Sequence, residues 1–177
     1  MASNPVVPSS HAEAMQPLSH PATGSPARPG KLALYAHNGG RIGVMAEVST
    51  VTEAASRTPA FASFVHEITL QIAAAAPSYV SDEEIPPETL VHMAQEASDR
   101  ARRAGKPERI VAKIVAGVLE KYKNEHVLMR QPYIRDESIC IAHCLAQICD
   151  ELGENIVVRR FLRWEIGPQS EQGEAPQ

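Results

Sequence analysis

The three cysteines of the chain carry its most reactive side chains, and all three fall within one predicted helix. Cys140 and Cys144 are four residues apart and therefore share a helix face, and Cys149 follows five residues later. His143 adjoins Cys144 but points to another face, and the sequence has no C-x-x-C pair with zinc-ligand spacing. Thiols that are buried as small hydrophobic side chains are favoured over a metal site or a redox or dimer-linking thiol. An odd cysteine count also disfavours a disulfide framework and indicates a reducing compartment.

A glycine-rich segment and several glutamates are the remaining candidates for chemistry. The segment 39–43 (GGRIG) lies between two predicted strands, whereas a phosphate-binding loop leads into the N-terminus of a helix. Glu53, Glu83 and Glu84 have no second acid positioned near them for glycosidase chemistry. The sequence contains no H-E-x-x-H and no G-x-S-x-G motif. We therefore expect a protein that acts by binding and is not an enzyme, with no catalytic residue, no cofactor and no metal.

The elements that position these residues follow from hydrophobic periodicity. Residues 32–48 alternate in two runs around Asn38-Gly39-Gly40, which predicts a β-hairpin. Apolar residues at three- and four-residue steps then predict four helices, at about 59–76, 88–104, 107–124 and 138–152. A last strand is expected at 155–166, with Ile156, Val158, Leu162, Trp164 and Ile166 on one face. Strands at both ends with helices between them predict an α+β fold, an antiparallel sheet covered by the four helices.

The two ends of the chain differ in composition from the part between them. Residues 1–30 are rich in Pro, Ser and Ala, and residues 168–177 repeat this pattern, so we expect disordered tails around a folded domain at 31–167. Overall, 44% hydrophobic and 21% charged residues are ordinary for a globular protein. No apolar run is long enough to span a bilayer, and neither a secretory signal nor a transit peptide is recognisable. These features predict a cytoplasmic protein without a membrane partner.

Charge is distributed unevenly along the predicted helices. Residues 82–98 contain acidic residues and no Lys or Arg, whereas residues 100–123 contain eight basic residues and two acidic ones. Solvated helix faces account for such clusters, and a basic patch for an acidic partner or for RNA is the alternative. Aromatic residues, 5% of the chain, do not interleave with the basic ones, and the net charge is −4. Both facts argue against nucleic acid as a partner.

Five segments, in order, are similar to a known family. The segment 35–48 (YAHNGGRIGVMAEV) resembles the opening of the elongation factor Ts core, and the other four segments follow it in family order. They are Ile72-Ala73-Ala74 with Pro77 and Tyr79, then Gly105-Lys106-Pro107, then Leu128 with Gln131-Pro132, and finally 153–161 (GENIVVRRF). The resemblance covers residues 33–167 and implies a guanine nucleotide exchange factor that binds the GTPase elongation factor Tu and promotes GDP release.

The resemblance also implies which residues contact the partner. In the family, a Thr-Asp-Phe-Val segment after the second strand wedges into the partner near its magnesium site, and the matching positions here are Thr52, Glu53, Ala54 and Ala55. The turn residues His37, Gly39, Gly40 and Arg41 are expected to bind the partner or to build the hairpin. Glu53 keeps the acid, but Ala54 lacks the apolar wedge.

The chain departs from the family at a second place, its N-terminus. The family opens with a small helical module resembling a ubiquitin-associated domain, and residues 1–30 are instead a Pro/Ser-rich segment. One core copy is present, and single-core family members form homodimers, which we expect here. Two alternatives stay open: a divergent paralogue that binds the factor or dimerises without efficient exchange, and a module that binds RNA or the ribosome.

Overall fold

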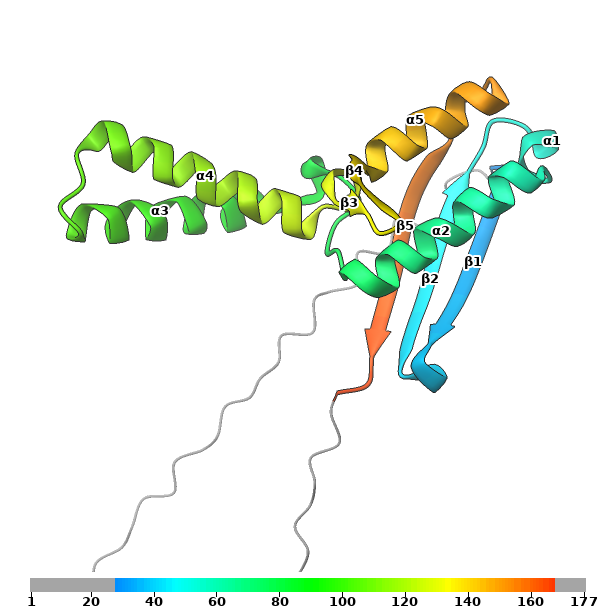
Figure 1. Cartoon of the computed structure of the whole chain (residues 1–177), viewed down its shortest axis with the longest axis horizontal. Helices are drawn as coiled ribbons and strands as arrows, with labels where there is room; N and C mark the ends of the chain where they lie inside the picture. Colours follow the sequence, from blue (N-terminus) through cyan, green and yellow to red (C-terminus); the bar gives the residue numbers. More distant parts are fainter. Residues whose placement is uncertain (1–27, 168–177) are drawn as a thin grey trace, which may run out of the picture.

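The computed structural model describes residues 28–167, which form a three-stranded antiparallel sheet with helices on one side (Figure 1). The strands are β1 (Gly30–His37), β2 (Ile42–Ser49) and β5 (Val157–Glu165), in the order β1-β2-β5. The expected α+β class and the hairpin with a C-terminal third strand are therefore confirmed. Except for residues 28–30, the predicted tails at 1–30 and 168–177 lie outside the described residues, and Gly30 belongs to β1.

Helix α2 (Pro59–Ala75) builds the core against one face of the sheet. Its Thr58 N-cap hydroxyl accepts a hydrogen bond from the Phe61 amide at 3.1 Å, and Pro59 occupies the first turn, where proline is well tolerated. Phe61, Ile68 and Ile72 are buried against Val44, Ala46 and Val48 of β2. Helix α5 (Ile141–Leu152) contributes Ile141 and Ile148 to the same core. The short α1 (Glu53–Ser56) lies between β2 and α2.

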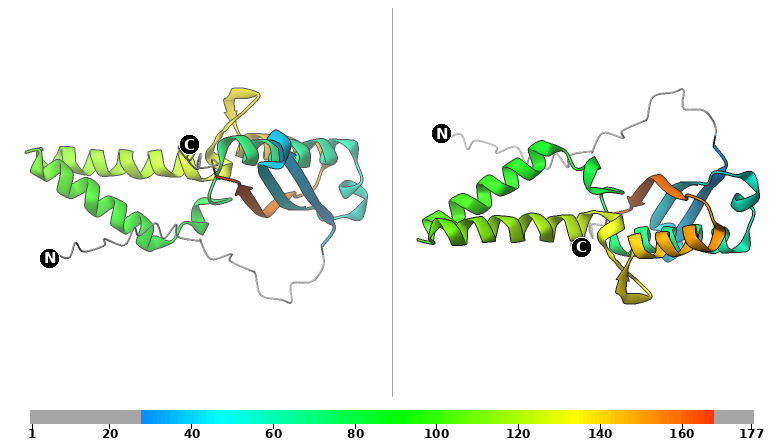
Figure 2. Two further views of the ribbon diagram at one scale, coloured as in Figure 1. Left: turned by 90° about the horizontal axis from the view of Figure 1, so that it is seen from below. Right: turned by 90° about the horizontal axis from the view of Figure 1, so that it is seen from above.

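Helices α3 (Pro87–Arg103) and α4 (Glu108–His126) do not cover the sheet, contrary to the sequence prediction. They form an antiparallel helical hairpin that extends away from it, as three views agree (Figures 1 and 2). Ala97 and Ala101 of α3 and Val111 of α4 are buried. The other residues of the apolar stripe of α4 are only half-buried, namely Ile110, Ile114, Val115, Val118, Leu119 and Tyr122. The amphipathic pattern is real, but each helix buries its stripe against the other rather than against the main core.

The helical hairpin is attached to the sheet domain by a buried polar junction. The Gln131 side-chain amide donates to the Ala75 and Glu125 carbonyls at 3.2 and 2.8 Å, and its oxygen accepts from Gln71 at 3.3 Å. On the outside, Arg130 of η3 (Leu128–Arg130) binds Asp82 of η2 (Asp82–Glu84), with Nε and Oδ1 2.6 Å apart. Since Gln131 is buried and satisfied on both sides, it fixes the junction in one arrangement.

A β-bulge reverses the expected faces of the last strand. Val48 pairs with Val158 but the preceding Glu47 pairs with Arg160, so Arg159 is the extra residue. Beyond the bulge, Phe161 and Arg163 lie on the side of α2, and Trp164 is on the opposite, open face with 65% of its surface exposed. The prediction that Val158, Leu162 and Trp164 share one face is therefore wrong, because period-2 alternation does not count an inserted residue.

A second, two-stranded sheet was not predicted. It consists of β3 (Pro132–Tyr133) and β4 (Asp136–Cys140), so residues 138–140 are strand and α5 begins only at Ile141. The Tyr133 hydroxyl donates to Glu67 of α2 at 2.8 Å, and Arg135 forms an ion pair with the same carboxylate at 2.6 Å. The small hairpin is thereby tied to α2.

Candidate functional site

The segment Thr52–Ala55 lies at one end of the sheet, where β2 leads into α1 (Figure 1). Thr52 is the N-cap of α1, and its hydroxyl accepts a hydrogen bond from the Ala55 amide at 3.2 Å. Thr52, Glu53 and Ala54 are exposed, whereas Ala55 is buried. The chain thus anchors this segment by Ala55 and presents the preceding three side chains to solvent.

Glu154, from the loop between α5 and β5, holds the start of this segment in place. One carboxylate oxygen accepts from the Val51 and Thr52 amides at 2.7 and 2.8 Å, and the other accepts from the Thr52 hydroxyl at 2.6 Å. These hydrogen bonds, the one from the Thr52 hydroxyl above all, lower the pKa of Glu154 from its ordinary value. Sequence reasoning did not assign Glu154 a role, because its partners lie about a hundred residues earlier and follow no periodic pattern.

Glu53 and Ala54 differ in what they offer a partner. Glu53 forms an i,i+4 ion pair with Arg57 at 3.1 Å, and both side chains are more than half exposed. Such surface pairs contribute little, so the carboxylate can exchange its partner at low cost. Ala54 presents a single methyl group where an exposed α1 position has room for a large side chain.

The turn residues His37, Gly39, Gly40 and Arg41 are at the opposite end of the β1-β2 hairpin and are not brought together with Thr52–Ala55 (Figure 1). Gly39 and Gly40 have φ angles of 65° and 87°, a region that favours glycine. Arg41 donates from its guanidinium to the Ile166 and Gly167 carbonyls at 3.1 and 3.0 Å. His37 contacts the Tyr35 hydroxyl through Nδ1 at 2.9 Å. Of the two roles expected for these residues, the geometry supports building the hairpin.

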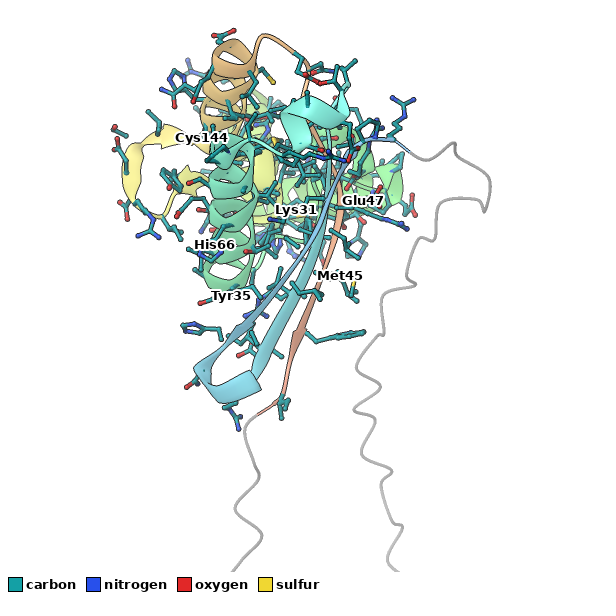
Figure 3. The ribbon with its side chains drawn as sticks, turned by 90° about the vertical axis from the view of Figure 1, so that its right-hand side faces the viewer. Lys31, Tyr35, Met45, Glu47, His66 and Cys144 are labelled. Atoms are coloured by element: carbon teal, nitrogen blue, oxygen red, sulfur yellow. The ribbon has the colours of Figure 1, made fainter. Side chains whose placement is uncertain are left out.

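The face of the sheet that is turned away from α2 is open and apolar. Figure 3 shows Met45 and Glu47 on this side of the strands, and Tyr35 with His66 on the side of α2. Leu32 and Leu34 of β1 are 59% and 72% exposed and pair with Glu47 and Met45 of β2. Glu47 forms an ion pair with Arg160 at 2.6 Å in the middle of this face. We call this surface, Leu32, Leu34, Met45, Glu47, Arg160, Leu162 and Trp164, the open sheet face.

The cysteines and carboxylates singled out by sequence do not assemble into a reactive site. Cys140, Cys144 and Cys149 are all free and half-buried, and burial is the main cause that raises the pKa of Cys144. Within residues 28–167, no group of three or more His, Cys, Asp or Glu side chains is arranged to hold a metal ion. No helix of the described part is long and apolar enough to cross a membrane.

Comparison with known proteins gives one consistent result. The family described as Elongation factor TS matches residues 25–168. An elongation factor Ts of Moorella thermoacetica is 40% identical over 151 residues, which cover 85% of this chain and 74% of that protein. An elongation factor Ts of Coprothermobacter proteolyticus is 42% identical over 144 residues, which cover 81% of this chain and 73% of that protein. An elongation factor Ts of Caldanaerobacter subterraneus is 43% identical over 144 residues, which cover 81% of this chain and 72% of that protein.

Proposed function

The chain belongs to the elongation factor Ts family, the nucleotide exchange factors of elongation factor Tu in translation elongation, and we propose that Thr52–Ala55 is the segment that reaches the partner's nucleotide site. As a family member, the protein acts by binding and is not an enzyme. The observation that carries the proposal is the presentation of Thr52, Glu53 and Ala54 at the exposed start of α1, held by Glu154.

The physical basis of exchange is linkage between two binding equilibria. A protein that binds the nucleotide-free GTPase more tightly than the GDP-bound form must weaken GDP binding by the same factor. Glu53 supplies a carboxylate that repels phosphate groups when it is brought close to them. A segment fixed in advance at both Thr52 and Ala55 loses little conformational entropy on docking.

The test measures release of fluorescent GDP from elongation factor Tu after an excess of unlabelled GDP is added. We expect the protein to accelerate release, and Glu53→Gln to reduce the acceleration. Glu125→Gln is the matched control, because Glu125 also forms an exposed i,i+4 ion pair, with Lys121 at 3.7 Å, but lies on α4. Equal effects of the two variants would contradict the role of Thr52–Ala55, and an unchanged release rate at saturating wild-type protein would contradict exchange itself.

The small side chain of Ala54 favours a second candidate function, in which the protein binds elongation factor Tu without efficient nucleotide exchange. Truncating a buried Phe anchor to Ala costs about 3–5 kcal/mol in a packed site, which is large compared with a typical coupling free energy of about 1–3 kcal/mol. Titration calorimetry separates the two candidates. Measurable binding together with unaltered GDP release would select the second candidate.

We further propose that two copies of the chain associate through the open sheet face. A sheet with an exposed apolar face is stabilised when another layer covers that face. The same face of a second copy can supply this layer, and the two sheets then form a β-sandwich. A two-fold axis through this face would also bring Glu47 of each copy near Arg160 of the other, because both lie in the middle of the face. The charges are therefore self-complementary.

Sedimentation equilibrium tests the dimer with a pair of matched variants. Leu34→Lys places a charge on the open sheet face and is expected to give monomers at micromolar concentration. Val91→Lys is the control, because Val91 is 68% exposed, close to the 72% of Leu34, but lies on α3. A monomeric wild-type protein, or equal masses for both variants, would contradict this interface.

A further inference from the structure

The free end of the α3–α4 hairpin is strongly basic. Residues 99–113 contain six basic and two acidic side chains, a net charge of +4 in a chain whose total is −4. All six basic side chains are exposed, and we call them the basic tip: Arg100, Arg102, Arg103, Lys106, Arg109 and Lys113. Only Arg102 forms an ion pair with another described residue, Glu108, at 2.8 Å. The positive charge of the tip is therefore largely uncompensated within residues 28–167.

Helix stability explains only half of this cluster. Arg100, Arg102 and Arg103 are at the C-terminal end of α3, where positive charges interact favourably with the helix dipole. Lys106 and Arg109 are instead at the N-terminal end of α4, where the dipole disfavours positive charge. Arg109 and Lys113 are four residues apart and so share one side of α4, and Lys106 lies just before its N-cap Pro107. Their repulsion at this end is a cost to the fold.

The basic tip is electrostatically separate from the acidic part of the molecule. Four of the five acidic residues in 82–98, Asp82, Glu83, Glu84 and Glu88, lie at the other end of the hairpin, at and before the start of α3, and only Glu96 lies near the tip. A helix of 17 residues is about 25 Å long, about three times the screening length of about 8 Å at physiological ionic strength. A polyanion that approaches the tip therefore experiences a positive potential in spite of the negative total charge.

The side chains of the tip indicate which kind of polyanion it fits. Protein interfaces need buried aromatic or aliphatic anchors, and no large hydrophobic side chain between Val91 and Ile134 is strongly exposed. Single-stranded RNA needs aromatic platforms, and residues 99–113 contain no aromatic residue. Four arginines and two lysines without such anchors match a phosphodiester backbone, to which guanidinium groups can donate two hydrogen bonds at once.

We infer that the basic tip of the α3–α4 hairpin binds the phosphate backbone of double-stranded RNA. This interaction is independent of sequence and does not involve Thr52–Ala55, so it goes beyond nucleotide exchange. The scarcity of aromatic residues, which argues against single-strand recognition, does not apply to a duplex, because duplex RNA is recognised by shape and backbone contacts. The basic tip lies at the end of the helical hairpin that is farthest from the sheet domain (Figure 2).

The test uses the full chain and a fluorescein-labelled RNA duplex of 20 base pairs with arbitrary sequence. Fluorescence anisotropy is expected to give a Kd on the order of 10 μM at 100 mM KCl, within the range of non-specific binding. With about four phosphate contacts, log K should fall against log salt concentration with a slope of about −4. Absence of binding at 50 mM KCl, or a slope near zero, would overturn the inference.

Two charge-matched double variants locate the contact. Arg103→Glu/Lys106→Glu changes the tip, and Lys31→Glu/Lys121→Glu makes the same change of charge at exposed positions on β1 and on the far part of α4. We expect the first to weaken duplex binding by about tenfold or more and the second by less than about twofold. The milder Arg103→Gln/Lys106→Gln variant should reduce the salt slope by about two. Equal losses for the two reversal variants would refute the assignment to the tip.

Competing probes distinguish RNA from other acidic partners. Single-stranded RNA of the same length should bind more weakly than the duplex, and a polyglutamate peptide of matched charge more weakly still. Tighter binding of the peptide would overturn the inference in favour of an acidic protein surface. Because elongation factor Tu is absent from these measurements, their outcome does not depend on whether the chain exchanges nucleotide.

Discussion

Restoring an aromatic side chain at position 54 tests how this protein disturbs its partner. Ala54 is an exposed position of α1, and a Phe there has no neighbouring core to displace. The helix-propensity cost is about 0.5 kcal/mol or less, so Ala54→Phe should leave the free energy of unfolding nearly unchanged. An altered exchange activity would then report on the partner contact rather than on folding.

The expected gain follows from the area that docking would bury. Full burial of an exposed Phe side chain is worth about 1.5–3 kcal/mol, so about 2 kcal/mol is a central value. This corresponds to about a 30-fold effect, since each 1.4 kcal/mol is a factor of ten. If the ring is buried only when GDP has left, the maximal rate of GDP release rises. If it is buried equally before and after release, only the half-saturating concentration falls.

The assay is stopped-flow release of fluorescent GDP from elongation factor Tu over a range of exchange-factor concentrations. Ala146→Phe is the control, because Ala146 is an exposed alanine on a different helix, α5. A change of less than twofold in both the maximal rate and the half-saturating concentration for Ala54→Phe would refute a partner contact at position 54. An equal gain for the Ala146→Phe control would refute it as well.

Three further predictions concern the scaffold. Gln131→Ala should lower the free energy of unfolding in urea by about 3 kcal/mol, because three buried hydrogen bonds of about 1 kcal/mol each are lost; a loss below about 1 kcal/mol would show that the junction is not rigid. The hydrogen bond from Arg130 is the main cause that lowers the pKa of Asp82, so its stabilisation is complete above the unfolded pKa of about 3.9 and disappears as pH falls through the lower folded value. Urea titrations should therefore show Asp82→Asn less stable than wild type at pH 7, with the difference shrinking towards pH 2; a constant difference would contradict this. Burial raises the pKa of Cys144, so in a Cys140→Ser/Cys149→Ser variant this thiol should react with Ellman's reagent at pH 8 more slowly than glutathione does.

Local patterns predicted the elements well where one residue type decides the structure. Thr58 and Pro59 set the start of α2, because the Thr58 hydroxyl caps the helix and proline suits its first turn. Asn38-Gly39-Gly40 sets the turn between β1 and β2, because few residue types adopt positive φ angles. The direction in which α3 and α4 bury their stripes could not be predicted. An apolar stripe indicates that a helix packs against another element, but it does not identify that element. Here the direction of the two helices depends on the buried junction at Gln131.

The sequence led to a proposal for the position of the candidate site but gave no indication of what supports it. The resemblance proposed Thr52–Ala55, but the sequence analysis predicted neither the short helix α1 nor its Thr52 cap. Glu154 supports the segment through hydrogen bonds to a residue more than a hundred positions earlier, and local sequence patterns do not predict such a contact. The open sheet face could not be predicted because of the bulge at Arg159. One inserted residue places Trp164 on the face opposite to Val158, with which it was expected to share a face.

The narrow attachment of the helical hairpin gives it the mechanics of a lever arm. Its angle is set at η2, η3 and Gln131, while its tip lies about 25 Å away. A rotation of about 10° at this pivot sweeps the tip through roughly 4 Å, enough to bring an arginine into or out of reach of a phosphate. Substitutions at the pivot can thus retune what the far end touches while every residue at that end stays the same.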